Sequence, residues 1–361
     1  MHSLIRGGTE RVVSTLADWF AENGDEAIVA TEEEASVEYP LHPAVRRVQV
    51  GLRPGDEGGR FRQTLLRVKY LRELIKTEKP DIVLAFGRDY NYRALMAKTK
   101  GVPVIISIRN PPLESYRTWQ HRAVMALLHP RAAGCVFQTA GQRAFFPKRT
   151  RQNSRIILNP LNPKYVGVLP PTERKKEVVH AGNLANFKNQ AGIVRSFIRV
   201  HADYPEYVLK LYGRDRGEGT KENLERIIAE NQAEGYVYLM GASDALEREL
   251  ADAAMFVFNS DWEGLPNSLM EAMALGLPVI ATDCPTGGPA ALISDGVDGL
   301  LIPIKDDNAL EQAMRRLLAD PIYAETLGKA ARRIGERCRL ETIARQWSDY
   351  IVEVTASHRD K

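Results

Sequence analysis

Short runs of Val, Ile and other apolar residues alternate with amphipathic segments along the whole chain of 361 residues. A buried parallel strand appears as a continuous apolar run, and its crossover as a helix of about 10–18 residues, so this alternation predicts βαβ units. The predicted strands of the first half are 26–30, 45–50, 81–85, 103–108, 133–138 and 155–158. Those of the second half are 177–181, 207–212, 236–240, 255–259, 278–282 and 299–302. Two such blocks predict two doubly wound, Rossmann-like α/β domains.

A proline-rich connector separates the two blocks. Asn159-Pro160-Leu161-Asn162-Pro163 is followed by Leu169-Pro170-Pro171, and proline supports neither a helix interior nor a central strand. We therefore place the first domain at residues 1–165 and the second at 166–339. Only Met1–Ile5 precede the glycine turn at Gly7, so the first strand is predicted to be missing or shortened, with a true start further upstream as the alternative.

Several classes of protein are excluded by composition. Hydrophobic residues make up 44% and charged residues 26% of the chain, as in globular proteins. No 18 consecutive residues are apolar, so no membrane-spanning helix is predicted. The three cysteines contain no Cys-x-x-Cys pair, which excludes a cysteine zinc site and fits a reducing cytoplasm. Because Asp-x-Asp and zinc-ligand spacings are also missing from the sequence, no metal is predicted.

The most informative segment is residues 259–280, which predicts a strand, a loop, a helix and a further strand. Pro266 suits the first position of a helix, and Gly276 suits its end. The N–H groups at that helix N-terminus would face the crevice above the sheet, where an anion such as a diphosphate can bind. Glu263 and Glu271, eight residues apart, could face the same ligand and accept hydrogen bonds from sugar hydroxyls.

This segment resembles the E-x7-E signature of the retaining nucleotide-sugar glycosyltransferases of family 4, which have the GT-B fold. The spacing lies in EGLPNSLME and is accompanied, in order, by GGTERVV, HAGNLANFKNQ, LKLYGRD and DGVDGLLIPIKD. The resemblance spans nearly the whole chain. It implies two Rossmann-like domains facing a cleft, the first for the acceptor and the second for the nucleotide sugar, with helix 340–356 packed back on the first.

The resemblance also implies roles for individual residues. Glu271 would bind the ribose and Glu263 the donor sugar, while Lys188 corresponds to the phosphate-binding lysine of the family. Lys188 and Glu263 are the predicted catalytic residues. The remaining predicted donor-binding residues are Gly182, Asn183, Gly213, Arg214, Gly264, Leu265, Pro266, Asn267, Ser268 and Leu269. Many relatives carry an arginine where this chain has Asn183, so phosphate neutralisation would depend on Lys188, the helix N-terminus and Arg214.

Three residues of the first domain are predicted on the acceptor side of the cleft. Gly7 and Gly8 would let the backbone approach the ligand, with a simple tight turn as the alternative. Arg109 stands where many relatives have a histidine and could bind an acceptor phosphate, with a structural arginine as the alternative. His121 and His180 are predicted to be a surface and a core residue, respectively, rather than catalytic bases.

Charge is distributed unevenly along the chain. The first 170 residues carry 26 Lys and Arg against 16 Asp and Glu, and the remainder carries 23 against 30. Acceptors of similar bacterial enzymes are often polyprenyl-pyrophosphate or polysaccharide intermediates, so we expect contact with an anionic membrane through residues 60–79 and 145–149. The predicted location is cytoplasmic, with peripheral attachment to the inner face of the plasma membrane in lipopolysaccharide, capsule or other polysaccharide biosynthesis.

The predicted function is transfer of a hexose or N-acetylhexosamine from a UDP-sugar to a hydroxyl of a lipid-linked or polysaccharide acceptor. The predicted reaction retains the anomeric configuration and uses no cofactor or metal. An NAD-dependent oxidoreductase is the alternative, although the sequence contains no G-x-G-x-x-G fingerprint. An inactive transferase relative is a second alternative. A nucleic-acid binder is disfavoured because no recognition motif is present in the sequence.

Overall fold

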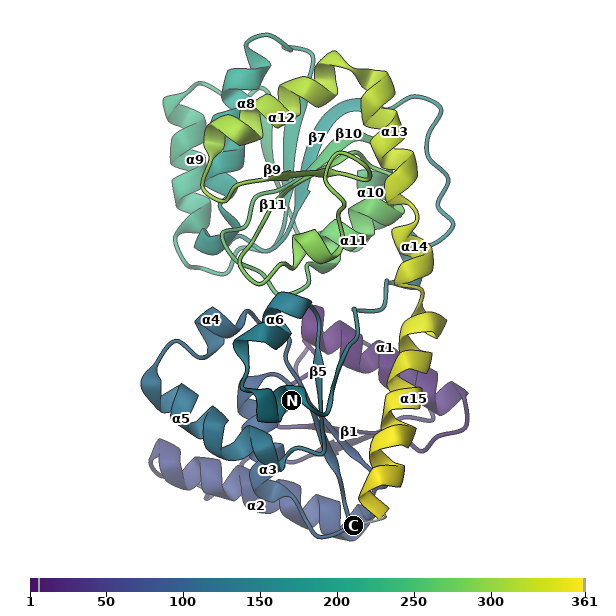
Figure 1. Ribbon diagram of the computed structural model, residues 1–361. Helices are drawn as coiled ribbons and strands as arrows, with labels where there is room; N and C mark the ends of the chain where they lie inside the picture. Colours follow the sequence, from purple (N-terminus) through teal and green to yellow (C-terminus); the bar gives the residue numbers. More distant parts are fainter. Residues whose placement is uncertain (6, 360–361) are drawn as a thin grey trace. The chain divides into compact units, whose positions relative to one another are not determined.

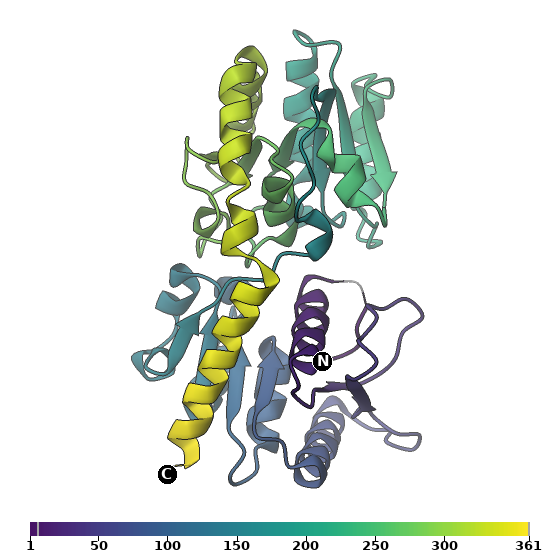
Figure 2. The ribbon, with the colours of Figure 1, turned by 90° about the vertical axis from the view of Figure 1, so that its right-hand side faces the viewer.

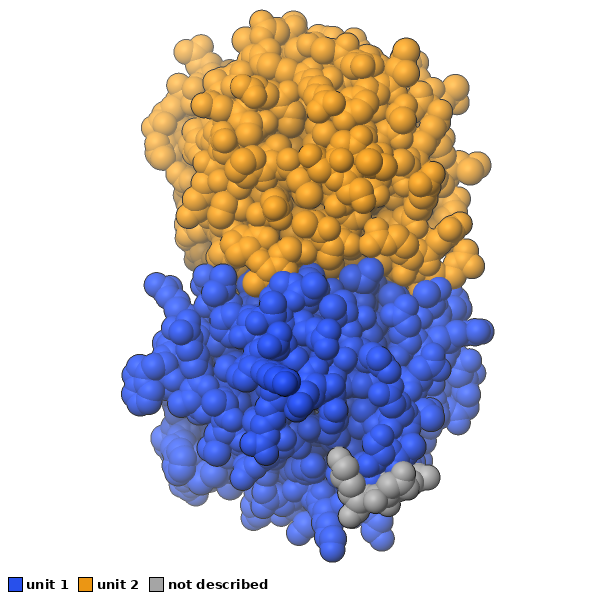
Figure 3. Space-filling model, viewed as in Figure 1, with its two compact units in different colours: residues 1–160, 340–361 blue, residues 161–339 orange. Residues whose placement is uncertain are grey.

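The structure, a computed structural model, describes residues 1–5 and 7–359 and contains two compact units (Figures 1 and 3). Unit 1 comprises Met1–Pro160 together with the segment from Leu340 onward, and unit 2 comprises Leu161–Arg339. The division therefore falls at Pro160, earlier than the predicted boundary after residue 165. The Leu161 N–H donates to the Cys338 carbonyl at 2.7 Å, which ties the start of the connector to unit 2.

Unit 1 is built on four parallel strands in the order β3–β4–β5–β6. These strands are β3 (Val83–Phe86), β4 (Val104–Ser107), β5 (Gly134–Phe137) and β6 (Ser154–Ile156). A separate parallel pair is formed by β1 (Ile28–Thr31) and β2 (Arg46–Gln49). Residues 1–5 form no strand: the Glu32 N–H donates to the Met1 and His2 carbonyls, and Ile5 makes one bridge to Glu38. This arrangement agrees with the predicted loss or shortening of the first strand.

The helices of unit 1 include α2, which contains most of the segment at residues 60–79 that was expected to contact a membrane. Their bounds are α1 (Gly8–Glu22), α2 (Arg60–Glu78), α3 (Arg88–Ala97), α4 (Pro112–Ser115), α5 (Trp119–Leu128), α6 (Ala140–Phe145), α7 (Lys148–Arg151) and α15 (Leu340–Arg359), with a 3-10 turn η1 (His129–Arg131).

Helix α15 packs along unit 1, as Figure 2 shows in yellow. Trp347 is fully buried beside Phe86, with ring centroids 5.5 Å apart. The Tyr350 hydroxyl accepts from the Cys135 N–H at 3.0 Å and donates to the Asn153 carbonyl at 2.8 Å. The last helix of the chain is therefore part of the core of unit 1.

Unit 2 contains one sheet of six parallel strands in the order β12–β11–β10–β7–β8–β9. The strands are β7 (Lys175–Ala181), β8 (Val208–Tyr212), β9 (Val237–Gly241), β10 (Ala253–Phe258), β11 (Val279–Thr282) and β12 (Leu300–Ile302). The chain builds outward from β7 to β9, then returns and builds in the other direction from β10. Strands β7 and β10 thus flank a topological switch point, where ligands of such sheets bind beyond the carboxyl ends.

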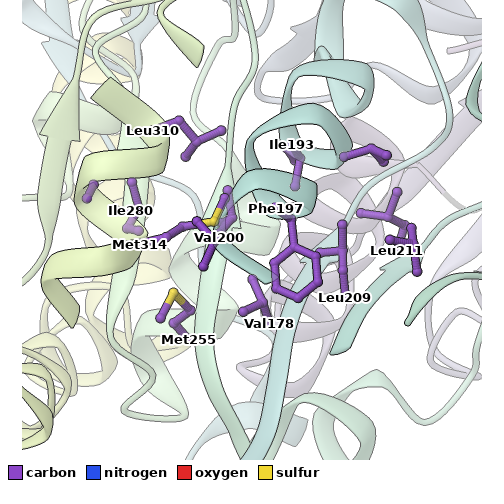
Figure 4. Close-up of a cluster of buried hydrophobic side chains, with 14 of the residues drawn as sticks. Val178, Ile193, Phe197, Val200, Leu209, Leu211, Met255, Ile280, Leu310 and Met314 are labelled. Atoms are coloured by element: carbon purple, nitrogen blue, oxygen red, sulfur yellow. The ribbon is translucent and has the colours of Figure 1, made fainter. Parts of the chain in front are cut away.

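The helices of unit 2 enclose its sheet. They are α8 (Gln190–His201), α9 (Thr220–Glu230), α10 (Leu246–Ala251), α11 (Asn267–Ala274), α12 (Asp307–Ala319), α13 (Pro321–Ala331) and α14 (Ile334–Arg337), with 3-10 turns η2 (Pro163–Tyr165), η3 (Asn186–Lys188) and η4 (Pro289–Ala291). In Figure 4, Phe197 of α8 and Met314 of α12 lie against Val178 and Met255 of the central strands. Within residues 1–5 and 7–359, every helix is too short or too polar to cross a bilayer.

Candidate donor site at the switch point of unit 2

Two loops lie side by side at the carboxyl ends of β7 and β10. Strand β7 leads into Gly182 and the turn η3, and β10 leads through residues 259–266 into α11. The parent strands are hydrogen-bonded neighbours, with Val179 opposite Phe256. Between the loops, the Asp261 N–H donates to the Phe187 carbonyl at 2.7 Å.

The predicted residues Lys188 and Glu263 form an ion pair between these loops. Their side chains are only 15% and 16% exposed, and the Ser260 hydroxyl also donates to the Glu263 carboxylate at 3.3 Å. The Lys188 ammonium lies 5.3 Å from the centre of the Phe258 ring, within range of a cation–π interaction. A largely desolvated ammonium, paired with a carboxylate, is therefore held at the switch point.

Helix α11 presents its N-terminus at the same place. Pro266 is the N-cap and Asn267 the first helical residue, so the prediction that Pro266 occupies the first helical position was wrong by one residue. The Met270 N–H donates to the Pro266 carbonyl. The N–H groups of the residues before Met270 therefore lie at the N-terminal end of the helix, ahead of its repeating i to i−4 hydrogen bonds. Glu271 lies one turn further on and is 7% exposed. Residues 264–269 and Glu271 are thus gathered at one helix end.

The predicted glycines mark a close approach of two strand ends. The Gly182 N–H donates to the Tyr212 carbonyl at 2.9 Å, and a Cβ on Gly213 would lie 2.0 Å from the Gly182 carbonyl oxygen. The next residues, Asn183 and Arg214, are exposed. The Arg214 carbonyl accepts from the Leu184 N–H at 2.9 Å. The structure therefore brings all four residues to the carboxyl edge of the sheet, with the Asn183 and Arg214 side chains open to solvent.

The loop at residues 283–288, which follows β11, contacts the residues before α11. A Cβ on Gly288 would lie 1.8 Å from the Gly264 carbonyl oxygen, so the two backbones are in contact. The Ser260 carbonyl accepts from the Thr282 hydroxyl at 2.6 Å and from the Cys284 thiol at 3.1 Å. The contacts of Ser260 with Thr282 and Cys284 were not predicted from the sequence, because only the pairing of β10 with β11 brings these residues together.

His180 is a core residue, as predicted. It is fully buried, and its Nδ1 lies 2.9 Å from the Val257 carbonyl oxygen. Burial lowers the pKa of His180 to about 4, so the ring is neutral near pH 7. His180 is therefore a structural group beneath the Lys188–Glu263 pair.

Arg109 lies inside unit 1 instead of facing an open acceptor site. Its guanidinium donates to the Asn159 side-chain oxygen at 2.7 Å and lies 5.0 Å from the Phe86 ring centre. Trp347 of α15 contacts it from another side, 5.8 Å from the ring centre. Burial lowers the pKa of Arg109 to about 9. The prediction that Arg109 is placed to bind an acceptor phosphate is therefore not supported, and the structural alternative fits the geometry.

The glycine turn of unit 1 is the N-cap of α1. Gly7 is the capping residue and Gly8 begins the helix. A Cβ on Gly7 would lie 2.3 Å from a Glu10 carboxylate oxygen, and burial raises the pKa of Glu10. The helix N-terminus is thus close to a carboxylate of its own first turn. An acceptor role for Gly7 and Gly8 stays a prediction.

The predicted aromatic and basic segment at residues 145–149 differs from expectation. Phe146 is 2% exposed, and Phe145 packs beside it against the core cluster of unit 1. Lys148 and Arg149 are exposed. The Phe146 ring fills the space between Tyr116 and Phe137, so the exposed basic side chains are the part of this loop that is open to solvent, and its contact with a membrane stays a prediction.

No group of three or more His, Cys, Asp or Glu within residues 1–5 and 7–359 is arranged to hold a metal ion. Metal independence stays a prediction about the reaction.

Two family models together match residues 6–334 of the chain. The first, described as Glycosyltransferase Family 4, matches residues 6–164, and the second, described as Glycosyl transferases group 1, matches residues 163–334. Their junction falls in the connector between the two units. The oxidoreductase alternative is not favoured by these matches.

Curated relatives include glycosyltransferases of bacteria and archaea. An uncharacterized glycosyltransferase of Methanocaldococcus jannaschii is 28% identical over 65% of this chain and 64% of its own length. A Campylobacter jejuni N-acetylgalactosamine-N,N'-diacetylbacillosaminyl-diphospho-undecaprenol 4-alpha-N-acetylgalactosaminyltransferase is 24% identical over 89% of both chains. The chain spans 64% of the first relative and only 19% of a Streptomyces coelicolor exopolysaccharide phosphotransferase that is 30% identical over 51% of this chain.

Solved structures share the fold of the whole chain. Sucrose-phosphate synthase from Thermosynechococcus elongatus has a TM-score of 0.84 at 20% identity, covering 97% of this chain and 94% of its own. Anabaena HepE in complex with UDP has a TM-score of 0.80 at 16% identity, covering 98% and 100%. At these identities the likeness concerns the fold.

Proposed function

Since the chain belongs to the family 4 glycosyltransferases and has the two-domain GT-B fold, we propose that it transfers a sugar from a UDP-sugar to a glycan hydroxyl. The observation that carries this proposal is the Lys188–Glu263 pair at the switch point of unit 2, beside the N-terminus of α11. This site combines one cation, a helix N-terminus and two carboxylates. That combination suits a ligand with both a diphosphate and sugar hydroxyls.

Each group has one task in the proposed reaction. The Lys188 ammonium and the amides at the start of α11 stabilise the charge that develops on the departing diphosphate. Glu271 accepts hydrogen bonds from the ribose, and Glu263 from the donor sugar. Because protein charges and the helix dipole meet the diphosphate, the transfer needs no metal. The HepE complex with UDP supports uridine as the nucleoside of the donor.

We further propose a hexose or N-acetylhexosamine donor and retention at the anomeric carbon. The names of two relatives support both points: the Campylobacter enzyme is a 4-alpha-N-acetylgalactosaminyltransferase, and a Bacillus subtilis relative, 29% identical over 53% of this chain, is a poly(glycerol-phosphate) alpha-glucosyltransferase. UDP-hexoses are ordinarily α-linked, so an α-linked product corresponds to retention. The acceptor hydroxyl attacks the face that the diphosphate leaves, and we assign no covalent nucleophile.

Calorimetric titration with UDP, GDP and NADH tests the donor. We expect binding of UDP alone, with the same affinity in the presence of EDTA. Binding of NADH without UDP would revive the oxidoreductase alternative. Loss of UDP binding on adding EDTA would contradict metal independence, and no binding at all would favour an inactive relative.

We propose a lipid-linked acceptor, bound by unit 1, and peripheral attachment to the cytoplasmic face of an anionic membrane. The diphospho-undecaprenol substrate in the name of the Campylobacter relative and the basic first half of the chain support this location. Two helices of unit 1 have exposed apolar side chains beside arginines. These are Phe61 on α2, 78% exposed, and Trp119 and Leu127 on α5, 74% and 66% exposed. Residues 119 and 127 are two turns apart and share one helix face.

We expect the double substitution Trp119→Gln and Leu127→Gln to reduce binding to vesicles rich in phosphatidylglycerol by about 100-fold or more, because each apolar side chain that the bilayer buries contributes about 1.5–3 kcal/mol. Co-sedimentation at low salt measures this loss. Ile322→Gln is the matched control, because Ile322 is 80% exposed but belongs to unit 2. Equal binding by the double variant and the wild type would exclude α5 as the contact surface.

A further inference from the structure

Two aromatic rings stack directly beside the Lys188–Glu263 pair. The Phe187 and Trp262 ring centroids are 3.9 Å apart and their planes differ by 13°. Each ring belongs to the residue immediately before one member of the ion pair. Both are half-buried, and the large core cluster of unit 2 contains neither. The two rings stack outside this core and at the edge of the candidate ligand site, so packing of the core does not account for the stack.

The stack is the middle of three contacts that join the two loops. The Asp261 N–H donates to the Phe187 carbonyl at 2.7 Å, Trp262 stacks on Phe187, and Glu263 pairs with Lys188. The contacts therefore run in the same order along both segments, from residues 261 to 263 on one loop and from 187 to 188 on the other. Together they fix the register of one loop against the other.

Each loop is also anchored at one end. Asn189 follows Lys188 in a left-handed conformation, with φ of 47°, and its side chain caps α8 by accepting from the Gly192 N–H. On the other loop, the Ser260 carbonyl is held by Thr282 and Cys284. The stack then joins the parts of the two loops that lie next to these anchors. The backbone at Lys188 and Glu263 is thus held in place, although the two side chains themselves are long.

A bound diphosphate would compete with Glu263 for Lys188. The ammonium is already paired with a carboxylate, and a carboxylate next to a phosphate is repulsive. Donor binding therefore requires an exchange in which Lys188 moves its hydrogen bond to the diphosphate and Glu263 becomes free to accept from sugar hydroxyls. During that exchange the ion pair no longer holds the loops together, whereas the Phe187–Trp262 stack still can.

We propose that the Phe187–Trp262 stack is a positioning element that keeps Lys188 and Glu263 in place while their ion pair opens for the donor diphosphate. This inference rests on the proposed function. It extends that function to two residues that act through Lys188 and Glu263 and do not themselves bind the ligand. Neither Phe187 nor Trp262 was selected from the sequence. Their place directly before Lys188 and Glu263 is the only sequence signal that pointed to them.

Binding of UDP and of uridine to Trp262→Ala tests the proposal by calorimetry. Lys188 meets the diphosphate and not the nucleoside, so we expect about a tenfold loss of UDP affinity, as for one coupled contact, and an unchanged affinity for uridine. Trp262→Phe retains a ring and should stay within about threefold of the wild type for UDP. Tyr238→Ala is the matched control, because Tyr238 is a 38% exposed aromatic residue elsewhere in unit 2.

A double substitution separates positioning from direct contact. If the stack acts through Lys188, then Trp262→Ala should cost little further UDP affinity in a Lys188→Ala background. Full additivity of the two losses would overturn the proposal, as would an equal loss for UDP and uridine, which would indicate that the ring touches the ligand or supports the fold. If the wild type binds UDP, Lys188→Ala weakens it and Trp262→Ala does not, the proposed function stands and this inference fails. If the wild type binds no UDP, both fail.

Discussion

Lys188→Ala is expected to weaken UDP binding by about 10–100-fold, because a hydrogen bond to a charged group contributes about 1.5–3 kcal/mol. The effect on sugar transfer should be larger, about 10²–10³-fold in kcat, since the departing diphosphate carries more charge in the transition state than in the bound donor. Calorimetry with UDP and a transfer assay with a panel of UDP-hexoses and UDP-N-acetylhexosamines measure the two losses. Lys221→Ala is the control, because Lys221 pairs with Glu225 on the surface of α9 at 3.6 Å and is 47% exposed.

Glu263→Gln should have the opposite effect on binding. Because the carboxylate occupies the Lys188 ammonium, its removal frees that ammonium and should leave UDP affinity unchanged or improved, while transfer falls. This pair of outcomes distinguishes a competing carboxylate from one that supports the phosphate site. If Lys188→Ala bound UDP as tightly as the wild type, or if Glu263→Gln lost UDP binding as severely as Lys188→Ala, the assigned roles would be wrong.

The strands and the helix after Glu263 were predictable because their signals are local. Each buried strand is an apolar run, and α11 is bounded by Pro266 and by Gly276, whose φ of 75° suits a helix end. The E-x7-E spacing likewise lies within a single loop and helix. Even there, the exact start of α11 differed by one residue, because a proline fits both the N-cap and the first turn.

The contacts that complete the site were not predictable, because they join distant parts of the chain. Lys188 and Glu263 are 75 residues apart, and their ion pair exists only because β7 and β10 are neighbours in the sheet. The sequence indicates that both are strands but not that they pair.

The same reason explains the error at Arg109. Its partners are Asn159, 50 residues away, and Trp347 in the last helix. A residue after a buried strand is ordinarily expected at the open edge of a sheet. Here α15 covers that position, and the resemblance that predicted the packing of helix 340–356 did not indicate which side chains it would bury.

Gly213→Ala is expected to destabilise unit 2 by about 1–3 kcal/mol, as for an overpacked interior position. A Cβ at this position would lie 2.0 Å from the Gly182 carbonyl oxygen and 2.7 Å from its carbon. Both are backbone atoms, so no side-chain rotation relieves the overlap. The Gly213 N–H also donates to the Gly241 carbonyl at 2.7 Å, which holds the end of β8 from its other side. The strain must therefore move the end of β7, which leads to Lys188.

That displacement should reduce the rate of sugar transfer by more than the loss of folded protein alone would. A misplacement of about 1 Å at a reacting group can cost about 10²-fold in rate, so we expect a loss of transfer well beyond the unfolded fraction, together with weaker UDP binding. Thermal unfolding and calorimetry on the same preparation separate the two effects. Gly235→Ala is the matched control, because its Cβ would meet nothing within 4 Å and should change stability by no more than about 0.5 kcal/mol. A Gly213→Ala protein that is destabilised but binds UDP normally would place the ends of β7 and β8 outside the donor site, and Lys188 would then have to reach the diphosphate from a turn that tolerates movement.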